Sequence, residues 1–391
     1  MPVEGNAGRT ARRGAATGLI VLLGLTLGLC LAGPAAAENE AGRAPVRALF
    51  IPLADHYAPV VAFEKYRERM VHADFRLERV DGPWLVRTRF REPDVDLAFE
   101  VAPMAMDMFR EQPDFRWIGL LHRDGNALAI NDLLASYIAL PTERRKRLPD
   151  QRIADGLKQA RAAYGRPVEV GIPHPQATHT AVLYKFLKDH GLTLGLGYGL
   201  DPDVVGVSVS PPKAPAFVKR MSSRGTPAGF EQSLPWAEAV ETAGFGQVAW
   251  YSKDVLRWPR GHVECVILAK DRAIAAKRAA LAEVVRYIHL AGMDIEVARR
   301  AGGPAMDEII RMIRRHIPEH TPEAIRESLR PDLNVINYRH LNVDKAGLRQ
   351  IMDLSVEAHM IPAGVDIDAF ADEDFSTDIT DAELPASELP K

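Results

Sequence analysis

Short apolar runs rich in β-branched residues alternate along this chain with longer stretches whose apolar positions recur at helical spacing. The run at 46–53, VRALFIPL, is typical of a buried first strand, and the stretch at 57–70 is typical of the helix that follows it. Further runs typical of strands lie at 75–80, 95–101, 115–121, 127–130, 167–172, 203–209, 228–231, 248–251 and 263–270. Further stretches typical of helices lie at 141–166, 181–190, 214–222 and 274–292. Because strands that alternate with helices build mainly parallel sheets with helical crossovers, this pattern predicts an α/β fold.

The loops after the predicted strands are the expected ligand site. In open α/β sheets a ligand lies beyond the carboxyl ends of the strands. The loops at 53–57, 81–84, 102–106 and 122–126 are therefore candidate ligand loops in the first part of the chain, and the loop at 173–180 is one in the second part.

The N-terminus has the three parts of a secretory signal peptide. Arg9, Arg12 and Arg13 form a positive segment, and an almost unbroken apolar run follows at 19–31. A stretch of small residues then ends at Ala37, after which we expect cleavage. The alternative is a membrane anchor, but the run is short for a bilayer crossing, which takes about 20 residues. We therefore predict that residues 1–37 are a signal peptide and that the protein is exported to the periplasm.

Composition and charge exclude several classes of function. The formal net charge is −3 over 391 residues, with both signs interspersed, and no basic stripe suited to nucleic acid is present. Only Cys265 remains if Cys30 is removed with the leader, so we expect neither a disulfide framework nor a metal site. His316 and His320 are spaced four apart without the Glu of a zinc-protease motif, and we expect them at the surface. The acidic segment 366–391 is expected to be a disordered tail.

Five short segments follow one another in an order that resembles a known family. They are Phe50–Leu53 with Asp55, Gly82–Trp84, Ala102–Met104, Pro173–His179, and Gly229–Phe230 with Pro235–Trp236. Their order and spacing are similar to those of the nitrate, bicarbonate and sulfonate binding proteins of ABC transporters, a family that extends to binders of thiamine-pyrimidine precursors. The matching segments together span about 46–270.

The resemblance implies a two-lobed periplasmic binding fold of type II, in which each lobe is a mainly parallel sheet flanked by helices. Lobe 1 would comprise 46–135 plus 262–360, and lobe 2 would comprise 136–261. The implied function is capture of a small polar or anionic solute, such as nitrate or a sulfonate, by hinge closure. The implied partner is an ABC permease in the inner membrane; we expect a monomer, no cofactor, no catalytic residue and no nucleic acid.

Thr178 and His179 are the most informative candidate ligand-binding residues. They lie where a predicted strand meets a helix, so the N–H groups of the first helical turn would point into the cleft and hold an anion or a polar oxygen. Thr178 would cap this helix, and His179 would add a donor that titrates near neutral pH. The alternative is that Thr178 only caps and that His179 only packs.

Five further residues complete the predicted site. The resemblance implies that Asn126 places its amide on the ligand, although Asp124 and Gly125 beside it also suit a plain structural turn. His56 is expected to contact the ligand, whereas its neighbour Asp55 is expected to cap the following helix. The remaining candidates in the cleft are Trp84, Glu231 and Trp236.

Departures from the family pattern leave the identity of the bound solute open. Ser233 and Leu234 replace a glycine and a glutamate of nitrate-type members, and Cys265 stands where many of them have a lysine. The loss of that cation weakens the case for an anion, and an inward-facing Glu231 would favour a neutral or cationic group. The alternatives are a pyrimidine-like or other aromatic nutrient on the same fold, or a sensory or enzymatic relative that does not serve transport.

Overall fold

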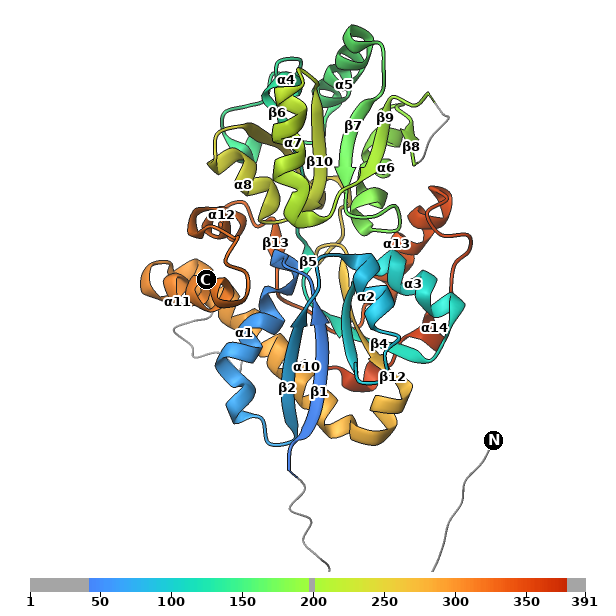
Figure 1. The fold of residues 1–391 in the computed structure, drawn as a ribbon, viewed down its shortest axis with the longest axis vertical. Helices are drawn as coiled ribbons and strands as arrows, with labels where there is room; N and C mark the ends of the chain where they lie inside the picture. The colour runs from blue at the N-terminus through green and yellow to red at the C-terminus, as the bar shows by residue number, and fades with distance from the viewer. Residues whose placement is uncertain (1–41, 197–200, 378–391) are drawn as a thin grey trace, which may run out of the picture. The chain divides into compact units, whose positions relative to one another are not determined.

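The computed structural model describes residues 42–196 and 201–377 (Figure 1). The predicted signal peptide, residues 1–37, lies outside the described residues. No helix within the two described ranges is both long enough and apolar enough to cross a membrane.

A five-stranded sheet in the order β2-β1-β3-β12-β4 forms one half of the fold. Its strands are β1 (Ala44–Phe50), β2 (Ala73–Arg79), β3 (Leu97–Val101), β4 (Phe115–Leu120) and β12 (Cys265–Lys270). β1 runs parallel to β2 and β3, whereas β12 is antiparallel to both β3 and β4. The helices that accompany this sheet in Figure 1 are α1 (Tyr57–Tyr66), α2 (Pro83–Arg89), α3 (Ala102–Glu111) and α10 (Asp271–Ala301). The carboxyl ends of β1 and β3 and the start of β12 therefore share one edge.

A six-stranded sheet in the order β11-β6-β10-β7-β9-β8 forms the other half. Its strands are β6 (Asn126–Asn131), β7 (Val168–Ile172), β8 (Leu194–Gly195), β9 (Val204–Ser208), β10 (Ala228–Ser233) and β11 (Gly246–Tyr251). The strands from β10 to β8 are parallel, and β6 is antiparallel to its two neighbours. Its helices are α4 (Asp132–Ala135), α5 (Gln151–Tyr164), α6 (Thr178–Asp189), α7 (Ala214–Ser223), α8 (Trp236–Thr242) and α9 (Ser252–Val255). The predicted α/β fold with flanking helices is confirmed, and both sheets are mixed, each with parallel and antiparallel pairs.

Two chain segments connect the sheets, one between β4 and β6 and the other between β11 and β12. In the first, β5 (Arg123–Asp124) pairs with β13 (Ile336–Asn337). The Arg123 guanidinium is buried and donates to Asp344 Oδ2 at 2.8 Å and to the carbonyls of Gly261 and His340 at 3.0 Å. Gly125 follows with a φ of 101°, which a residue with a Cβ rarely adopts. Arg123 thus ties the two connections together.

The C-terminal part packs against both halves. It consists of α11 (Gly303–His316), α12 (Pro322–Ser328), α13 (Lys345–Glu357), α14 (Ile367–Phe370) and a 3₁₀ turn at Glu373–Phe375. α12 contacts α8, and α13 contacts both α3 and α6. The predicted acidic tail, 366–391, begins with folded residues. Phe370 and Phe375 in it are buried, because their rings provide apolar surface among residues that are otherwise acidic. The rest of that segment, 378–391, lies outside the described residues.

Three local predictions differ from the structure. The helix expected at 141–166 begins only at Gln151, because Pro149 interrupts it and Asp150 supplies the N-cap by accepting from the Arg152 N–H at 3.1 Å. The helix expected at 181–190 begins three residues earlier, at Thr178. His320 is buried rather than at the surface, since its Nδ1 pairs with the Tyr57 hydroxyl at 2.9 Å.

Candidate functional site

Strand ends from both sheets bring together a set of fully buried polar side chains, here named the polar cluster. From the five-stranded half come side chains beyond β1, beyond β4 and at the start of β12, and from the six-stranded half come side chains of β6, β10 and the first turn of α6. The members are Asp55, His122, Asn126, Thr178, His179, Glu231, Ser233, Glu264 and Cys265. Burial of so many groups that water would otherwise solvate is costly unless they find partners.

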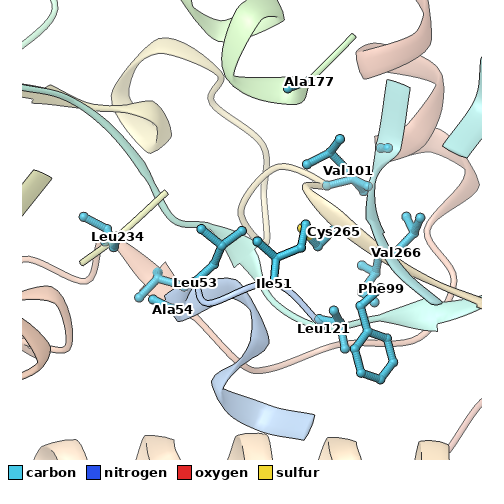
Figure 2. Close-up of a cluster of buried hydrophobic side chains, with 14 of the residues drawn as sticks. Ile51, Leu53, Ala54, Phe99, Val101, Leu121, Ala177, Leu234, Cys265 and Val266 are labelled. Atoms are coloured by element: carbon cyan, nitrogen blue, oxygen red, sulfur yellow. The ribbon is translucent and has the colours of Figure 1, made fainter. Parts of the chain in front are cut away.

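Apolar side chains from both halves lie in the same region as Cys265 of this cluster. Figure 2 shows residues that follow β1 (Ile51, Leu53 and Ala54) in one buried cluster with Ala177 and Leu234 of the six-stranded half. The Ala54 N–H donates to the Leu234 carbonyl across the two halves at 2.7 Å. The polar cluster is therefore shut off from solvent in this state of the protein.

Ser233 joins the two halves through hydrogen bonds. Its hydroxyl donates to Asp55 Oδ2 at 2.6 Å, and the same oxygen lies 2.7 Å from His179 Nε2. Since the hydroxyl proton is used on Asp55, the imidazole must be the donor, and His179 carries its proton on Nε2. The unprotonated Nδ1 then faces Glu264 Oε1 at 3.4 Å.

Asp55 is surrounded by further groups of its own half. The same oxygen, Asp55 Oδ2, lies 3.6 Å from His122 Nε2 and 3.7 Å from Cys265 Sγ. The expectation that Asp55 caps the following helix is wrong, because its carboxylate makes no cap hydrogen bond and points to Ser233 instead. Thr178 does not cap α6 either, because it is the first helical residue and Ala177 holds the cap position.

Burial shifts the titration of the cluster toward neutral forms. It raises the pKa of Asp55 to about 7 against the opposing effect of the Ser233 and Cys265 hydrogen bonds. Burial, reinforced by neighbouring carboxylates, raises the pKa values of Glu231 and Glu264 well above the usual range. Burial lowers the pKa of His179 to about 3. The histidines are thus uncharged, and lone pairs rather than positive charges face the carboxyl groups.

Many polar atoms of the cluster have no hydrogen-bond partner of ordinary geometry among the described residues, although the side chains of Thr178 and Asn126 approach the Glu264 carboxyl group and the Arg123 backbone approaches His122. They are Asp55 Oδ1, both ring nitrogens of His122, both amide atoms of Asn126, Thr178 Oγ1, His179 Nδ1, and both carboxyl oxygens of Glu231 and of Glu264. About 90% or more of buried polar groups in native proteins are paired, so an aggregation of unpaired atoms at one place is unusual. Their concentration at facing strand ends makes the polar cluster the candidate functional site.

The seven residues predicted as ligand-binding lie in three kinds of place. Asn126, Thr178, His179 and Glu231 belong to the polar cluster. His56 is buried beside it, with Nδ1 accepting from the Ile51 N–H at 2.7 Å and Nε2 unpaired. The other two, both tryptophans, lie elsewhere and are described next.

The two predicted cleft tryptophans are not members of the cluster. Trp84 lies on α2 with 53% of its surface exposed. Trp236 is buried at the start of α8, where its Nε1–H donates to the Pro52 carbonyl at 3.0 Å and its ring meets the His320 ring edge-on. Trp236 thus anchors the six-stranded half to the loop after β1.

Sequence reasoning did not select five members of the cluster as ligand-binding: Asp55, His122, Ser233, Glu264 and Cys265. Asp55 and His122 each follow a correctly predicted strand, so their positions were a usable signal. Glu264 and Cys265 begin a strand, and they reach the same edge because β12 is antiparallel to β3. That direction is decided by tertiary pairing.

Comparisons with known proteins agree with this architecture. No curated protein sequence matches the chain significantly. Among solved structures, the periplasmic nitrate-binding protein NrtA from Synechocystis PCC 6803 is similar with a TM-score of 0.69 and 16% identity, over 89% of this chain and 91% of that one. The ligand-binding component of an ABC-type import system from Staphylococcus aureus, solved with zinc bound, has a TM-score of 0.65 and 16% identity, covering 85% and 98%. The alkanesulfonate-binding protein SsuA from Xanthomonas axonopodis pv. citri, bound to MOPS, has a TM-score of 0.60 and 14% identity, covering 85% and 99%.

At these identities the likeness shows the fold, and the periplasmic-binding fold predicted from the sequence is confirmed. The model of the NMT1-like family matches residues 40–303, which is more than half of the chain. This chain belongs to the NMT1-like family.

Proposed function

We propose that this protein is the solute-binding component of an ABC importer, exported to the periplasm by its N-terminal segment and active as a monomer that delivers its solute to a permease. The observation that carries the proposal is the polar cluster, because both sheets build it at their facing strand ends and many of its buried atoms lack partners. A closed binding site between two lobes has these features.

Capture requires that the two halves open and close. The unpaired atoms would be hydrated in an open form, and a solute that pairs with them favours the closed form through its differential interaction. The side chains of Asp107 on α3 and Gln176 before α6 add a contact across the halves, with Gln176 Nε2 donating to Asp107 Oδ2 at 2.8 Å. In this proposal lobe 1 ends near residue 125 rather than near 135, because β6 pairs within the six-stranded sheet.

The charge of the cluster bears on the kind of solute. Asp55, Glu231 and Glu264 contribute carboxyl groups, and none of the residues that we assign to the cluster is a lysine or arginine. Nitrate or a sulfonate would meet these carboxyl groups without a compensating cation, which is unfavourable in a buried site. A neutral or cationic solute is favoured on this ground.

No catalytic role is part of the proposal. The Ser233 hydroxyl donates to Asp55 and accepts from His179 Nε2, so the imidazole is a donor and is not placed to activate a serine nucleophile. The arrangement holds a ligand rather than attacks one.

The test combines native mass spectrometry with small-angle X-ray scattering. The full chain is expressed with its own N-terminus, and the protein is recovered from the periplasm, analysed directly, and then freed of bound solute by reversible unfolding. We expect a bound small species in the first sample, and a radius of gyration that is larger in the solute-free protein and decreases when that species is returned. A scattering profile that is the same in both samples, with no bound species, would contradict the proposal.

A further inference from the structure

The polar cluster contains side chains of the types that coordinate transition metals. Two groups of three potential ligands share one carboxylate, and within each group the ligand atoms all lie within 4.8 Å of one another. The first group is Asp55, His122 and Cys265, and the second is Asp55, His179 and Glu264. All five side chains are buried.

We propose that the captured solute is a divalent transition-metal ion, bound by Asp55, His122 and Cys265 and then enclosed when closure brings His179 to the same carboxylate through Ser233. This inference rests on the proposed function and names the solute of that same site. The mixture of thiolate, imidazole and carboxylate donors suits Zn²⁺ and similar borderline cations. No metal site was expected from the sequence, because a single remaining cysteine and scattered histidines show no motif.

The distances between the donor atoms match those expected around a tetrahedral transition-metal ion. For bonds of about 2.1 Å to nitrogen or oxygen and about 2.3 Å to sulfur, tetrahedral ligands lie about 3.4 Å apart for an O–N pair and about 3.6 Å apart for an O–S pair. Asp55 Oδ2 is 3.6 Å from His122 Nε2 and 3.7 Å from Cys265 Sγ. His179 Nδ1 is 3.4 Å from Glu264 Oε1.

His179 has the hydrogen bonding that a metal-bound histidine needs. Metal-ligating imidazoles usually donate their other N–H to a neighbour that fixes the tautomer and ring orientation. Ser233 takes that role at Nε2, which leaves the lone pair of Nδ1 directed toward Glu264. When Glu264 is ionised, two lone pairs face each other here and repel, and either a proton on Glu264 or a cation between the two atoms removes the repulsion.

Two other ways of neutralising the cluster account for less of the geometry. Protons on the carboxyl groups neutralise their charge but leave His122 Nε2, at 3.6 Å from Asp55 Oδ2, without a hydrogen bond of ordinary length. An organic ammonium supplies donors, but it needs room for its carbon atoms, whereas each ligand group is confined within 4.8 Å. A single ion satisfies the lone pairs in that space.

The distribution of ligands over the two halves gives an order of events. Asp55, His122, Glu264 and Cys265 all come from the five-stranded half, whereas His179 comes from α6 of the six-stranded half. The open form therefore keeps the complete first group and can bind the ion before closure. Binding releases the thiol proton of Cys265 to solvent, because the thiolate is the ligand. Closure then brings His179 to Asp55 through Ser233, and Asp55 remains a ligand of the ion throughout.

The first experiment asks whether the chelator-treated protein binds metal and closes. The full chain, purified from the periplasm and stripped with a chelator, is titrated with Co²⁺ followed by absorbance and with Zn²⁺ followed by calorimetry. We expect one ion per chain, a thiolate-to-cobalt charge-transfer band, intense visible bands of a low-coordinate site, and a decrease in the radius of gyration with either metal.

Three variants separate binding from closure. Asp55→Asn should weaken Zn²⁺ binding at least tenfold and abolish closure. Cys265→Ser should remove the charge-transfer band. His179→Ala should keep the band and bind Co²⁺, with the radius of gyration remaining at the metal-free value. His289→Gln is the matched control, since His289 is a buried histidine bonded to Thr377 outside the cluster, and it should bind and close as the unaltered protein does.

The outcomes distinguish this inference from the proposed function. If no metal binds or closes the protein while an organic species co-purifies and does so, the metal assignment is overturned and the solute-binding function stands. Closure by ethylenediamine with no response to metal ions has the same meaning. If His179→Ala closes normally with metal, the order of events is wrong. If neither metals nor any co-purified species changes the scattering, both proposals fall.

Discussion

At the scale of single residues, Ser233 occupies the central position in the buried site. It ends β10 of the six-stranded sheet, yet its hydroxyl reaches Asp55 of the other half and orients His179 on its own half. It has no charge and is not among the candidate metal ligands, so we regard it as a positioning residue. Its hydroxyl fixes the direction of His179 Nδ1. By bonding to Asp55 Oδ2, it also leaves Asp55 Oδ1 without a close partner.

Replacement of Ser233 by alanine should weaken solute binding without loss of the fold. Loss of a group that orients a metal ligand typically costs about 10–100-fold in affinity, and we expect a decrease in that range for Zn²⁺ measured by calorimetry. Ser355→Ala is the matched control, because Ser355 is equally buried and bonds only to the Ile351 carbonyl on α13. An unchanged affinity in Ser233→Ala would show that His179 needs no support.

At the scale of elements, the segment after α13 is part of the folded protein as far as it is described. α14 lies against β4, where the Phe370 ring packs on Phe109, Phe115 and Trp117. A backbone bridge joins Ala371 to Trp117. The acidic composition of this segment reflects its exposed side, whereas its buried aromatic residues decide its position.

Phe370→Ala should therefore lower the free energy of unfolding. Truncation of a fully buried phenylalanine costs about 3–5 kcal/mol through lost apolar burial and the cavity that remains. The measurement is urea unfolding followed by tryptophan fluorescence, with Trp117 a reporter beside the site of change. Val71→Ala serves as the control, because Val71 is an exposed residue and should change stability by less than about 0.5 kcal/mol. A cost as small for Phe370 as for Val71 would show that α14 does not contribute to the folded state.

At the scale of the whole molecule, contacts outside the buried site also hold the two halves together. Asp107 of α3 accepts hydrogen bonds from Arg87, Arg110 and Gln176, and Gln176 comes from the six-stranded half. Burial raises the pKa of Asp107, but the hydrogen bonds from Arg110, Gln176 and Arg87 outweigh burial and lower the pKa below its usual 3.8. The ionised carboxylate therefore contributes to the closed state.

This contribution should depend on pH in a defined direction. Because the pKa of Asp107 is lowered in the folded, closed form, its stabilisation is complete above pH 3.8 and is lost as the pH falls through the lowered pKa. Thermal unfolding should show a loss of stability in that acid range, and Asp107→Asn should make the loss smaller. Near pH 7, Asp107→Asn should also bind solute more weakly, because the carboxylate bonds to Gln176 and Arg87 are weakened. Equal acid dependence in both proteins would show that Asp107 is not the group responsible.

Part of the site could be recognised from the order of residues alone. Periodicity placed the strands that carry it. Positions near strand ends selected Thr178, His179 and Glu231, the family resemblance selected Asn126, and the fold brings all four together. The roles given to side chains were less accurate. Asp55 and Thr178 both looked like helix caps, because short polar residues before a helix usually are, but Asp55 accepts from Ser233 and Thr178 approaches Glu264, each in the other half.

Local pattern along the chain was sufficient for the class of fold and for the edge of each sheet at which the site lies, because the alternation of apolar runs and amphipathic stretches is visible within short windows of residues. Strand pairing, in contrast, made β12 antiparallel, so that Glu264 and Cys265 reach Asp55, and brought Ser233 to the same carboxylate from the other sheet. The contacts of Asp55 with Ser233 and Cys265 join residues separated by 178 and 210 positions. The packing of one half on the other sets such distances, and no short stretch of residues encodes them.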